Sequence, residues 1–546
     1  MAAALGALAP SSSFAEGGWL PPVKLTETNA VDPQVGVFPN GEAIVAWGPK
    51  APSSAEAGGS GIEFSSRGAD GRFGPAQAAA PAGSIIPALA VNELGRSALT
   101  WYGDPAAAAL RAPGGGFGPA QAVTDGDAEV AIDGAGNGYV VASRANFGPS
   151  GTASLAVATL PVDGGPTQVR DVARMGHIFD PTIASGAAGR VTVAWQGGNE
   201  GEPPSEARVY TATAEPGGTF SAPSPISDLA YNNITSGGEL TRTLTNARGD
   251  TFVAWSAIET PNPRPDLPDY RHDQVLFGAF RRAGGSFGTP ERVPLPDERR
   301  RGIIRWDAAI GPSGEVLAAW SDGLSVSMTY RPPGGPFEPA RPADVYPECC
   351  SPTTAPRAAQ LDPAAALDPA GNGMVAYTSG SWGDMRLNVV RRPRGEGFLP
   401  PQSVVAAPHL FTPDIALDAA GNGLIAWSPQ ERTGSAGERK DRGLYAAAYD
   451  AKLAPAVTTI APARRRFGVE VTESGRAALV VKRKRGRRWA RVFAARKRVV
   501  PGYNLVELPA RHRKALSRRG RYLAEAHVVD ADGKRSKLRR RAFRVR

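Results

Sequence analysis

The chain has 546 residues, of which 42% are hydrophobic and 21% are charged, and its formal net charge is +10. This length suits several domains or one large repeat array, and no run reaches the roughly 18 apolar residues of a membrane-spanning helix. The 65 Gly and 50 Pro residues are spread between short apolar runs. This pattern predicts an all-β fold with many turns.

Residues 1–15 contain a short apolar stretch followed by Ser13-Phe14-Ala15, which places small residues at the −3 and −1 positions of a cleavage site. The pattern is typical of the end of a secretory signal peptide, although a positively charged start is missing. We therefore expect an extracellular or cell-surface-associated protein.

A hairpin phrase recurs along the chain and is clearest at residues 413–427. A short apolar run leads into a Gly-Asn turn, and a second apolar run ends in Trp427. Gly and Asn adopt positive φ at low cost, so the phrase predicts a β-hairpin. The phrase has eight copies, each with a glycine six residues before its last position: Gly41, Gly95, Gly136, Gly189, Gly249, Gly314, Gly371 and Gly421. The last positions are Trp47, Trp101, Ala142, Trp195, Trp255, Trp320, Tyr377 and Trp427.

Each hairpin is followed by a further apolar run and a short closing strand, usually with a Gly-Gly turn and an aromatic residue between them. Four strands in a repeat of about 54 residues are the signature of a β-propeller blade. We therefore expect an eight-bladed propeller over residues 16–454, or a seven-bladed one if the third copy is incomplete. Residues 17–25 read as a strand with no repeat before it, and we expect them to complete the last blade near Tyr449.

The repeat also predicts where the core lies. Small residues in the first strand of each copy suit the crowded axis of a propeller. The large residues that end the hairpins are expected between blades rather than against a ligand. Asp133, Asp368 and Asp418 precede the turns, and we expect them to cap the turn backbone rather than bind calcium. The histidines are dispersed without zinc spacing, so no metal or cofactor is expected.

The phrase Ile415-Ala416-Leu417-Asp418 followed by Gly421-Asn422 resembles the blade hairpins of bacterial secreted propellers, including NHL-type repeats and sialidase-like proteins. The resemblance covers residues 16–454 and implies a fold more than an activity. The sialidase Asp box, Ser-x-Asp-x-Gly-x-Thr-Trp, does not occur.

A basic segment follows the repeats. Residues 455–546 contain 28 basic and 6 acidic residues, a net charge of +22, whereas the rest contains 34 basic and 46 acidic residues, a net charge of −12. The split predicts a separate domain. Its alternating strands, ending in residues 520–533 and 543–545, resemble the last strands of an immunoglobulin- or fibronectin-like β-sandwich.

The strand order places the long, variable loops on one face of the ring, where binding sites are common. The richest loop, residues 259–273, offers carboxylates, Tyr, Arg and His for sugar binding or acid–base chemistry, and the seventh repeat offers Trp382 and Asp384. The alternatives are a solvated, proline-stiffened loop and a capping aromatic. The candidate ligand-binding residues are Asp266, Asp269, Tyr270, Arg271, His272, Trp382 and Asp384.

The basic domain is a candidate polyanion-binding surface, and the alternative is that its charges only solvate strand edges. Its candidate residues are Lys482, Arg483, Lys484, Arg485, Arg487, Arg488, Arg539, Arg540 and Arg541. The adjacent Cys349 and Cys350 leave open a vicinal disulfide, two thiols or an intermolecular link.

These features favour a monomeric, non-enzymatic binding scaffold. It would bind a polysaccharide or protein ligand on the long-loop face, and the basic domain would tether it to an anionic cell-envelope polymer. The alternative is a carbohydrate-active enzyme, a sialidase-like glycoside hydrolase or a lyase, using loop carboxylates at the channel mouth.

Overall fold

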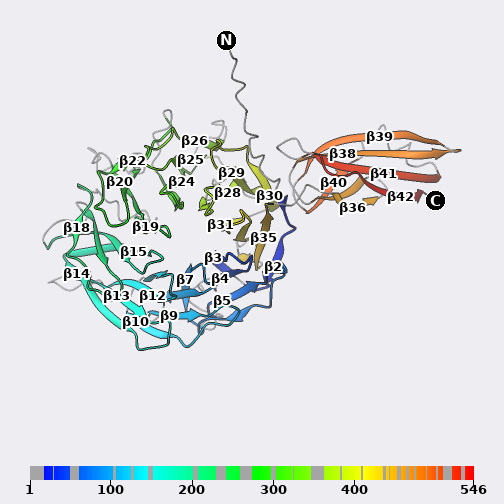
Figure 1. Cartoon of the computed structure of the whole chain (residues 1–546). Coiled ribbons are helices and arrows are strands. Elements are labelled where there is room, and N and C mark those ends of the chain that lie inside the picture. The colour runs from blue at the N-terminus through cyan, green and yellow to red at the C-terminus, as the bar shows by residue number, and fades with distance from the viewer. Residues whose placement is uncertain are drawn as a thin grey trace, which may run out of the picture. The chain divides into compact units, whose positions relative to one another are not determined.

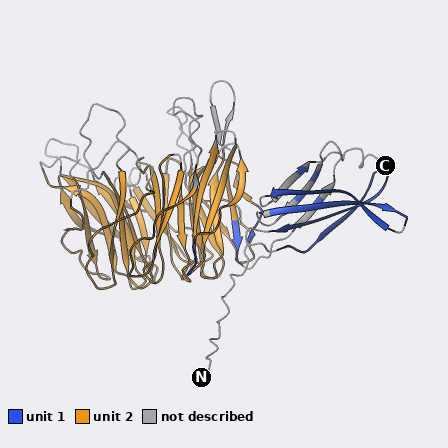
Figure 2. Ribbon diagram, turned by 90° about the horizontal axis from the view of Figure 1, so that it is seen from above, with its two compact units in different colours: residues 1–21, 395–397, 448–546 blue, residues 22–394, 398–447 orange. Residues whose placement is uncertain are grey.

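The computed structural model describes most of the chain between residues 18 and 545. None of the described residues lies in a helix, so the predicted all-β fold is confirmed. The chain forms two compact units, orange and blue in Figure 2: residues 22–394 with 398–447, and residues 1–21 with 395–397 and 448–546. The described residues are 18–28, 30–49, 61–102, 106–124, 128–144, 152–200, 207–228, 241–258, 274–296, 303–323, 325–345, 362–381, 384–407, 410–433, 438–441, 443–451, 457–462, 466–471, 475–486, 488–499, 502–507, 519–529 and 535–545.

Seven sheets of the described chain contain four antiparallel strands each, in chain order. Their strands are β3 (Ala30–Val37), β4 (Ala43–Pro49), β5 (Glu63–Arg67) and β6 (Gln77–Ala78); β7 (Ile85–Val91), β8 (Ser97–Tyr102), β9 (Ala106–Arg111) and β10 (Gln121–Thr124); β11 (Ala128–Ile132), β12 (Gly138–Arg144), β13 (Ala153–Leu160) and β14 (Gln168–Met175); β15 (His177–Ser185), β16 (Val191–Gly198), β17 (Arg208–Ala214) and β18 (Ser224–Pro225); β19 (Thr241–Thr245), β20 (Thr251–Ile258), β21 (Gln274–Arg281) and β22 (Glu291–Arg292); β23 (Arg305–Ile310), β24 (Val316–Ser321), β25 (Ser325–Arg331) and β26 (Arg341–Val345); and β27 (Ala364–Leu367), β28 (Gly373–Ser381), β29 (Asp384–Arg392) and β30 (Gln402–Ala407).

The last sheet of the ring joins the two ends of the repeat array. It contains β31 (Phe411–Leu417), β32 (Gly423–Ser428) and β35 (Leu444–Asp450), and β1 (Gly18–Trp19) and β2 (Val23–Thr26) complete it by pairing with β35. In this register Trp19 lies opposite Tyr449 and Val23 lies opposite Ala446. A separate hairpin, β33 (Gln430–Thr433) and β34 (Glu438–Asp441), follows β32. The predicted closure by residues 17–25 is therefore confirmed for Gly18 onward.

The first strand of each sheet contacts the first strand of the next, which arranges the sheets in a closed ring around a common axis (Figure 1). The contacts run from β3 through β7, β11, β15, β19, β23 and β27 to β31, and β31 contacts β3. The predicted propeller fold is confirmed, and the third repeat, which ends in Ala142, forms a complete four-stranded sheet.

The hairpins have the predicted local structure. All eight turn glycines adopt positive φ, between 78° and 101°, where a side chain would be strained. The residues that end the hairpins are 0–3% exposed, so they are core residues and do not form a stacking platform. Asp418 accepts hydrogen bonds from the backbone N–H of Ala420 and Asn422 and from the Asn422 side chain. Asp133 and Asp368 cap their turns in the same way.

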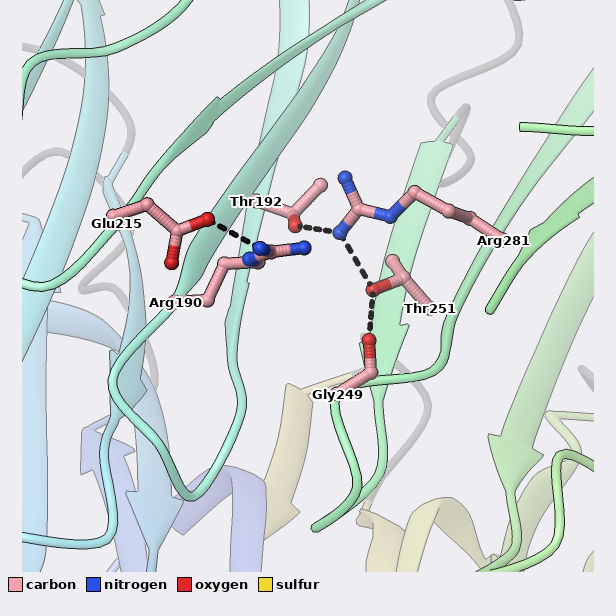
Figure 3. A network of polar contacts seen from close by, with 6 residues as sticks. All are labelled: Arg190, Thr192, Glu215, Gly249, Thr251 and Arg281. Atoms are coloured by element: carbon pink, nitrogen blue, oxygen red, sulfur yellow. Dashed lines mark hydrogen bonds and ion pairs between the residues drawn. The ribbon is translucent and has the colours of Figure 1, made fainter. Parts of the chain in front are cut away.

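Buried arginines on the third strands connect neighbouring sheets. Arg281 of β21 donates to the hydroxyl of Thr192 at 2.7 Å and to that of Thr251 at 3.0 Å, which joins the fourth sheet to the fifth (Figure 3). Its guanidinium also lies 4.9 Å from the centre of the Phe287 ring. Burial, followed by the charge of nearby Arg190, lowers the pKa of Arg281 to about 10.

The strands beyond residue 456 form two sheets. One contains β36 (Val457–Pro462), β37 (Arg466–Val471) and β40 (Gly502–Glu507), and the other has the order β39 (Arg488–Val499), β38 (Gly475–Arg485), β41 (Gly520–Val529) and β42 (Arg539–Val545). Both sheets contribute to one core, with Phe467 and Val506 from the first and Leu479, Phe493 and Tyr522 from the second. The immunoglobulin-like topology and the domain bounds 16–454 and 455–546 stay predictions.

Candidate active site

The first strands of the eight sheets, which we call the inner strands, all begin on one face of the ring, and we call the centre of that face the channel mouth. Because the strands of each sheet alternate in direction, this face also carries the connections between second and third strands and those between sheets. The hairpin turns, such as the one at Gly421, lie at the opposite face. The channel mouth is therefore on the long-loop face where the sequence predicted a ligand.

Four of the inner strands contain a strained β-bulge near their first residues. Asp32, Ile86, Asp180 and Thr412 each precede a proline and have φ between 36° and 51°, and each bulge interrupts the pairing with the second strand. Positive φ at a non-glycine residue costs on the order of 1 kcal/mol or more and is maintained only by the surrounding structure. Since Ile86 shares it, the bulge is a feature of the repeat, and at two positions the residue at the bulge is an aspartate.

Six ionisable residues from five consecutive sheets converge at this mouth, and we call them the channel cluster. The strand registers divide them into two layers. The outer three lie at a bulge or at the position of their own repeat that corresponds to it. The inner three lie two residues further along their strands. The channel cluster consists of Asp32, Arg305 and Asp362 in the outer layer and Arg242, Asp307 and Asp414 in the inner layer.

The outer layer is a pair of carboxyl groups with a guanidinium between them. Arg305 Nε lies 3.7 Å from Asp362 Oδ1, and the two side chains are 41% and 13% exposed. Burial raises the pKa of Asp362, the charge of Arg305 and the backbone N–H of Thr412 oppose this, and the charge of Asp32 adds to it. Burial also raises the pKa of Asp32, against the charge of Arg305.

Asp32 differs from the other channel carboxylates in its partners. No hydrogen bond from a described residue reaches its side chain, which is partly exposed. A carboxyl group with an elevated pKa and free oxygen atoms is suited to exchange a proton with a bound molecule.

The inner layer links neighbouring sheets. Asp414 of β31 accepts a hydrogen bond from the backbone N–H of Val35 in β3 at 2.6 Å and from its neighbour Ile415 at 2.8 Å. Asp307 of β23 accepts hydrogen bonds from Ala365 at 2.7 Å and from Arg242. These bonds fix the inner strands, and the bond to Val35 fixes the strand that carries Asp32.

Asp414 predicts how stability depends on pH. Burial raises its pKa to about 7 in spite of the hydrogen bond from Val35, whereas an unfolded Asp titrates near 3.9. Between about pH 4 and pH 7 the folded chain therefore holds a proton that the unfolded chain has released, so this group makes stability fall as pH rises.

We expect Asp414→Asn to be less stable than wild type at pH 5 by about 1–3 kcal/mol, because the amide offers one acceptor where two backbone N–H groups donate. At pH 8 the gap should narrow, since the variant has no carboxyl group to ionise. Urea unfolding at both pH values measures it, with Asp163→Asn, an exposed turn aspartate, as control. A gap that stays constant between pH 5 and pH 8 would contradict the assignment.

The loop residues that the sequence singled out are not part of this described site. Asp266, Asp269, Tyr270, Arg271, His272 and Trp382 lie outside the described residues, as does the side chain of Asp384, whose backbone begins β29. They stay predictions. The sequence analysis missed the channel cluster, although a signal was present: Asp-Pro occurs at one position of the repeat at Asp32, Asp180 and Asp362.

The predicted basic residues do not form one patch. Lys482, Arg483, Lys484 and Arg485 lie on β38, where alternate side chains point to opposite faces. Arg488 begins β39, residues 539–541 begin β42, and Arg487 lies outside the described residues.

In the described part of the chain no group of His, Cys, Asp or Glu is arranged to hold a metal ion. Nor does that part contain a helix that is long and apolar enough to cross a membrane. Cys349 and Cys350 lie outside it.

No protein-family model and no curated protein sequence matches this chain. Similar solved structures include an ulvan lyase of polysaccharide lyase family PL25, with 13% identity and a TM-score of 0.38 over 76% of this chain and 92% of that chain. A GH93 α-L-arabinofuranosidase of Fusarium graminearum has 7% identity and a TM-score of 0.35, with coverage of 80% and 97%. The NanB sialidase of Streptococcus pneumoniae has 8% identity and a TM-score of 0.29, with coverage of 71% and 90%.

The expectation of a non-enzymatic binding scaffold is corrected at this point. The three similar structures named above, the ulvan lyase, the arabinofuranosidase and the sialidase, are enzymes that act on carbohydrates, which agrees better with the alternative expectation. The physical reason for the difference is that the candidate residues were sought in the loops, whereas separate sheets bring other ionisable groups together at the start of the inner strands.

Proposed function

We propose that this chain is a carbohydrate-active enzyme that cleaves glycosidic bonds of an anionic polysaccharide at the channel mouth. One observation carries the proposal: Asp32, Arg305 and Asp362, from three different sheets, converge at the entrance to the channel. Two carboxyl groups and a cation at one opening form a reactive set, and sheets far apart in sequence supply it.

The chemistry follows from the different environments of the two carboxyl groups. Glycosidic cleavage commonly uses one carboxylic acid, which protonates the leaving oxygen, and one carboxylate, which acts as base or nucleophile. Burial raises the pKa of both groups, so their partners decide the assignment. Asp32 is assigned as the acid, because no described residue donates a hydrogen bond to its oxygen atoms. Asp362, beside Arg305, is assigned as the carboxylate.

Two cations at the mouth favour an anionic substrate. Arg305 pairs with Asp362 and Arg242 pairs with Asp307, and the two arginine side chains are still 41% and 33% exposed, so part of each remains accessible to a bound anionic group. Guanidinium groups bind carboxylate and sulfate-like oxygens in a bidentate manner. A uronate or sulfate group of the polymer would be held there while the acid faces the bond to be cleaved.

Several sequence-based predictions concern residues outside the described part of the chain, and they extend this proposal. Residues 259–273 and Trp382 would contact more distant sugars on the long-loop face. An extracellular location, from the signal-like residues 1–15, would place the enzyme where polysaccharides are found. A monomeric state stays a prediction.

The direct test is digestion of a polysaccharide panel by the purified full-length chain. Polymers that carry uronate or sulfate groups should be shortened, as measured by size-exclusion chromatography, and neutral glucans should not. New reducing ends alone indicate hydrolysis, whereas ultraviolet-absorbing unsaturated ends indicate elimination. If no polymer of the panel is shortened at any pH between 5 and 8, the proposal is wrong.

A further inference from the structure

The four-stranded sheet of residues 475–545 has one face turned away from the core. In β38, Ala477, Leu479 and Val481 are buried in the core, so the alternate side chains, which include Lys482 and Lys484, point outward. The pairing register extends this outer face across the sheet, because Lys482 lies opposite Arg491 and Lys484 lies opposite Trp489. Val480 points outward, and Glu525 of β41 lies opposite it, so Glu525 points outward as well. Arg540 of β42 lies opposite Glu525 and shares this face.

This outer face is strongly basic, and we call it the basic face. Its cations come from all four strands, from the two central strands as well as the two edge strands. The residues that define it are Lys482, Lys484, Arg491, Arg496, Arg521 and Arg540.

The only carboxylate on the described residues of these four strands is Glu525, and it is already occupied. Lys482 Nζ lies 2.5 Å from one of its oxygen atoms and Arg540 Nε lies 3.1 Å from the other. Burial alone would raise its pKa, but the hydrogen bonds and charges of Lys482 and Arg540 hold that pKa below its usual value. No described acidic side chain pairs with Lys484 or with the three arginines at 491, 496 and 521.

The arrangement is not explained by protection of strand edges. Lysine and arginine on an edge strand prevent sheets from pairing with each other, but β38 and β41 are central strands. Like charges directly opposite each other on neighbouring strands, such as Arg521 and Arg544, destabilise a sheet. A bound polyanion removes that repulsion.

The occupant that fits this face is a linear anionic polysaccharide. Neighbouring strands are about 4.8 Å apart and same-face residues along a strand about 6.7 Å apart, so the cations form a flat grid for a chain with repeated charges. Proteins that bind single-stranded nucleic acid stack successive bases on several aromatic side chains. On this sheet Trp489, 39% exposed, is the one strongly exposed aromatic among the described residues.

We propose that the basic face binds the acidic polysaccharide that the channel is proposed to cleave, and holds the enzyme on its polymer. The inference rests on the proposed function for the identity of the polymer. The binding itself depends on groups that take no part in the chemistry at the channel.

The test compares two full-length triple variants with the same change in charge. Lys484→Gln/Arg496→Gln/Arg521→Gln removes three cations of the basic face. Arg485→Gln/Arg488→Gln/Arg541→Gln removes three exposed cations at the hairpin end and on the opposite side of β42. The probes are immobilised dextran sulfate, neutral dextran and single-stranded DNA, and the readout is the affinity and its dependence on salt.

The basic-face variant should bind dextran sulfate about tenfold or more weakly, with a smaller salt dependence, and the control variant should bind nearly as wild type. An equal loss of affinity in both variants would mean that only the net charge matters. If the wild-type protein binds DNA as strongly as dextran sulfate, the face is a general polyanion-binding surface. Either result overturns the inference. Binding at the basic face does not require cleavage, so the Asp32→Asn variant should still bind dextran sulfate. The binding assay therefore tests the basic face separately from the proposed activity at the channel mouth.

Discussion

Asp32→Asn is expected to lower kcat by about 10²–10⁴-fold, the usual contribution of a general acid, without weakening the fold. Asn keeps the size of the side chain but does not supply an acidic proton. No described residue donates a hydrogen bond to the Asp32 carboxyl group, so the change leaves no backbone N–H group without its acceptor. The measurement is the initial rate on the polymer that wild type cleaves best, together with the thermal unfolding temperature.

The matched control is Asp180→Asn, an aspartate in the equivalent bulge at φ 47°. Its Oδ2 accepts a hydrogen bond from the backbone N–H of Thr241 at 2.7 Å, which the amide oxygen of Asn can accept as well, so this variant should keep most of its stability and activity. The wild-type rate should decline as pH rises through the raised pKa of Asp32, and Asp32→Asn should not show that decline. Equal activity losses in the two variants would remove Asp32 from the role of acid.

Trp19→Ala is expected to destabilise the chain by about 3–5 kcal/mol, as for other buried aromatic residues cut back to alanine. Trp19 is 0% exposed, and its ring centre lies 5.4 Å from that of Tyr449. It belongs to the short strand that pairs with the end of β35, so the change creates a cavity where the last sheet is completed. The shift of the urea-unfolding midpoint, followed by circular dichroism, measures the loss.

Two comparisons make this prediction specific. Trp19→Phe should cost much less, because it keeps an aromatic ring and removes an indole N–H that has no hydrogen-bond partner among the described residues. Trp489→Ala changes an exposed tryptophan and should shift stability by less than about 0.5 kcal/mol. A Trp19→Ala variant as stable as Trp489→Ala would show that this strand does not secure the ring.

The ring was predictable because its signals are local and repeated. A turn glycine such as Gly421 requires positive φ, and the aromatic six residues later fills the space between sheets, so the sequence shows each hairpin directly. The sequence also predicted that the N-terminal strand closes the ring, because this strand belongs to no repeat of its own and the last sheet would otherwise have an exposed edge.

The site was not predictable in the same way, because it is assembled from sheets that are distant in the chain. Asp32 and Asp362 are 330 residues apart and meet only because the ring is closed. The prediction favoured loops because loops commonly carry function. The basic run was likewise taken as one patch, whereas strand alternation turns Lys482 and Lys484 outward and lets Arg483 donate to the backbone of Arg519.

The pairing of Trp19 with Tyr449 constrains how the protein is made. The two residues are separated by 430 positions, so a ribosome that adds about 5–20 residues per second needs roughly 20–90 s between them. Throughout that interval the nascent array has two unsealed edges and is open to pairing with other chains. The growing chain therefore needs protection from aggregation, for example by a chaperone, until the strand that contains Trp19 can pair with Tyr449.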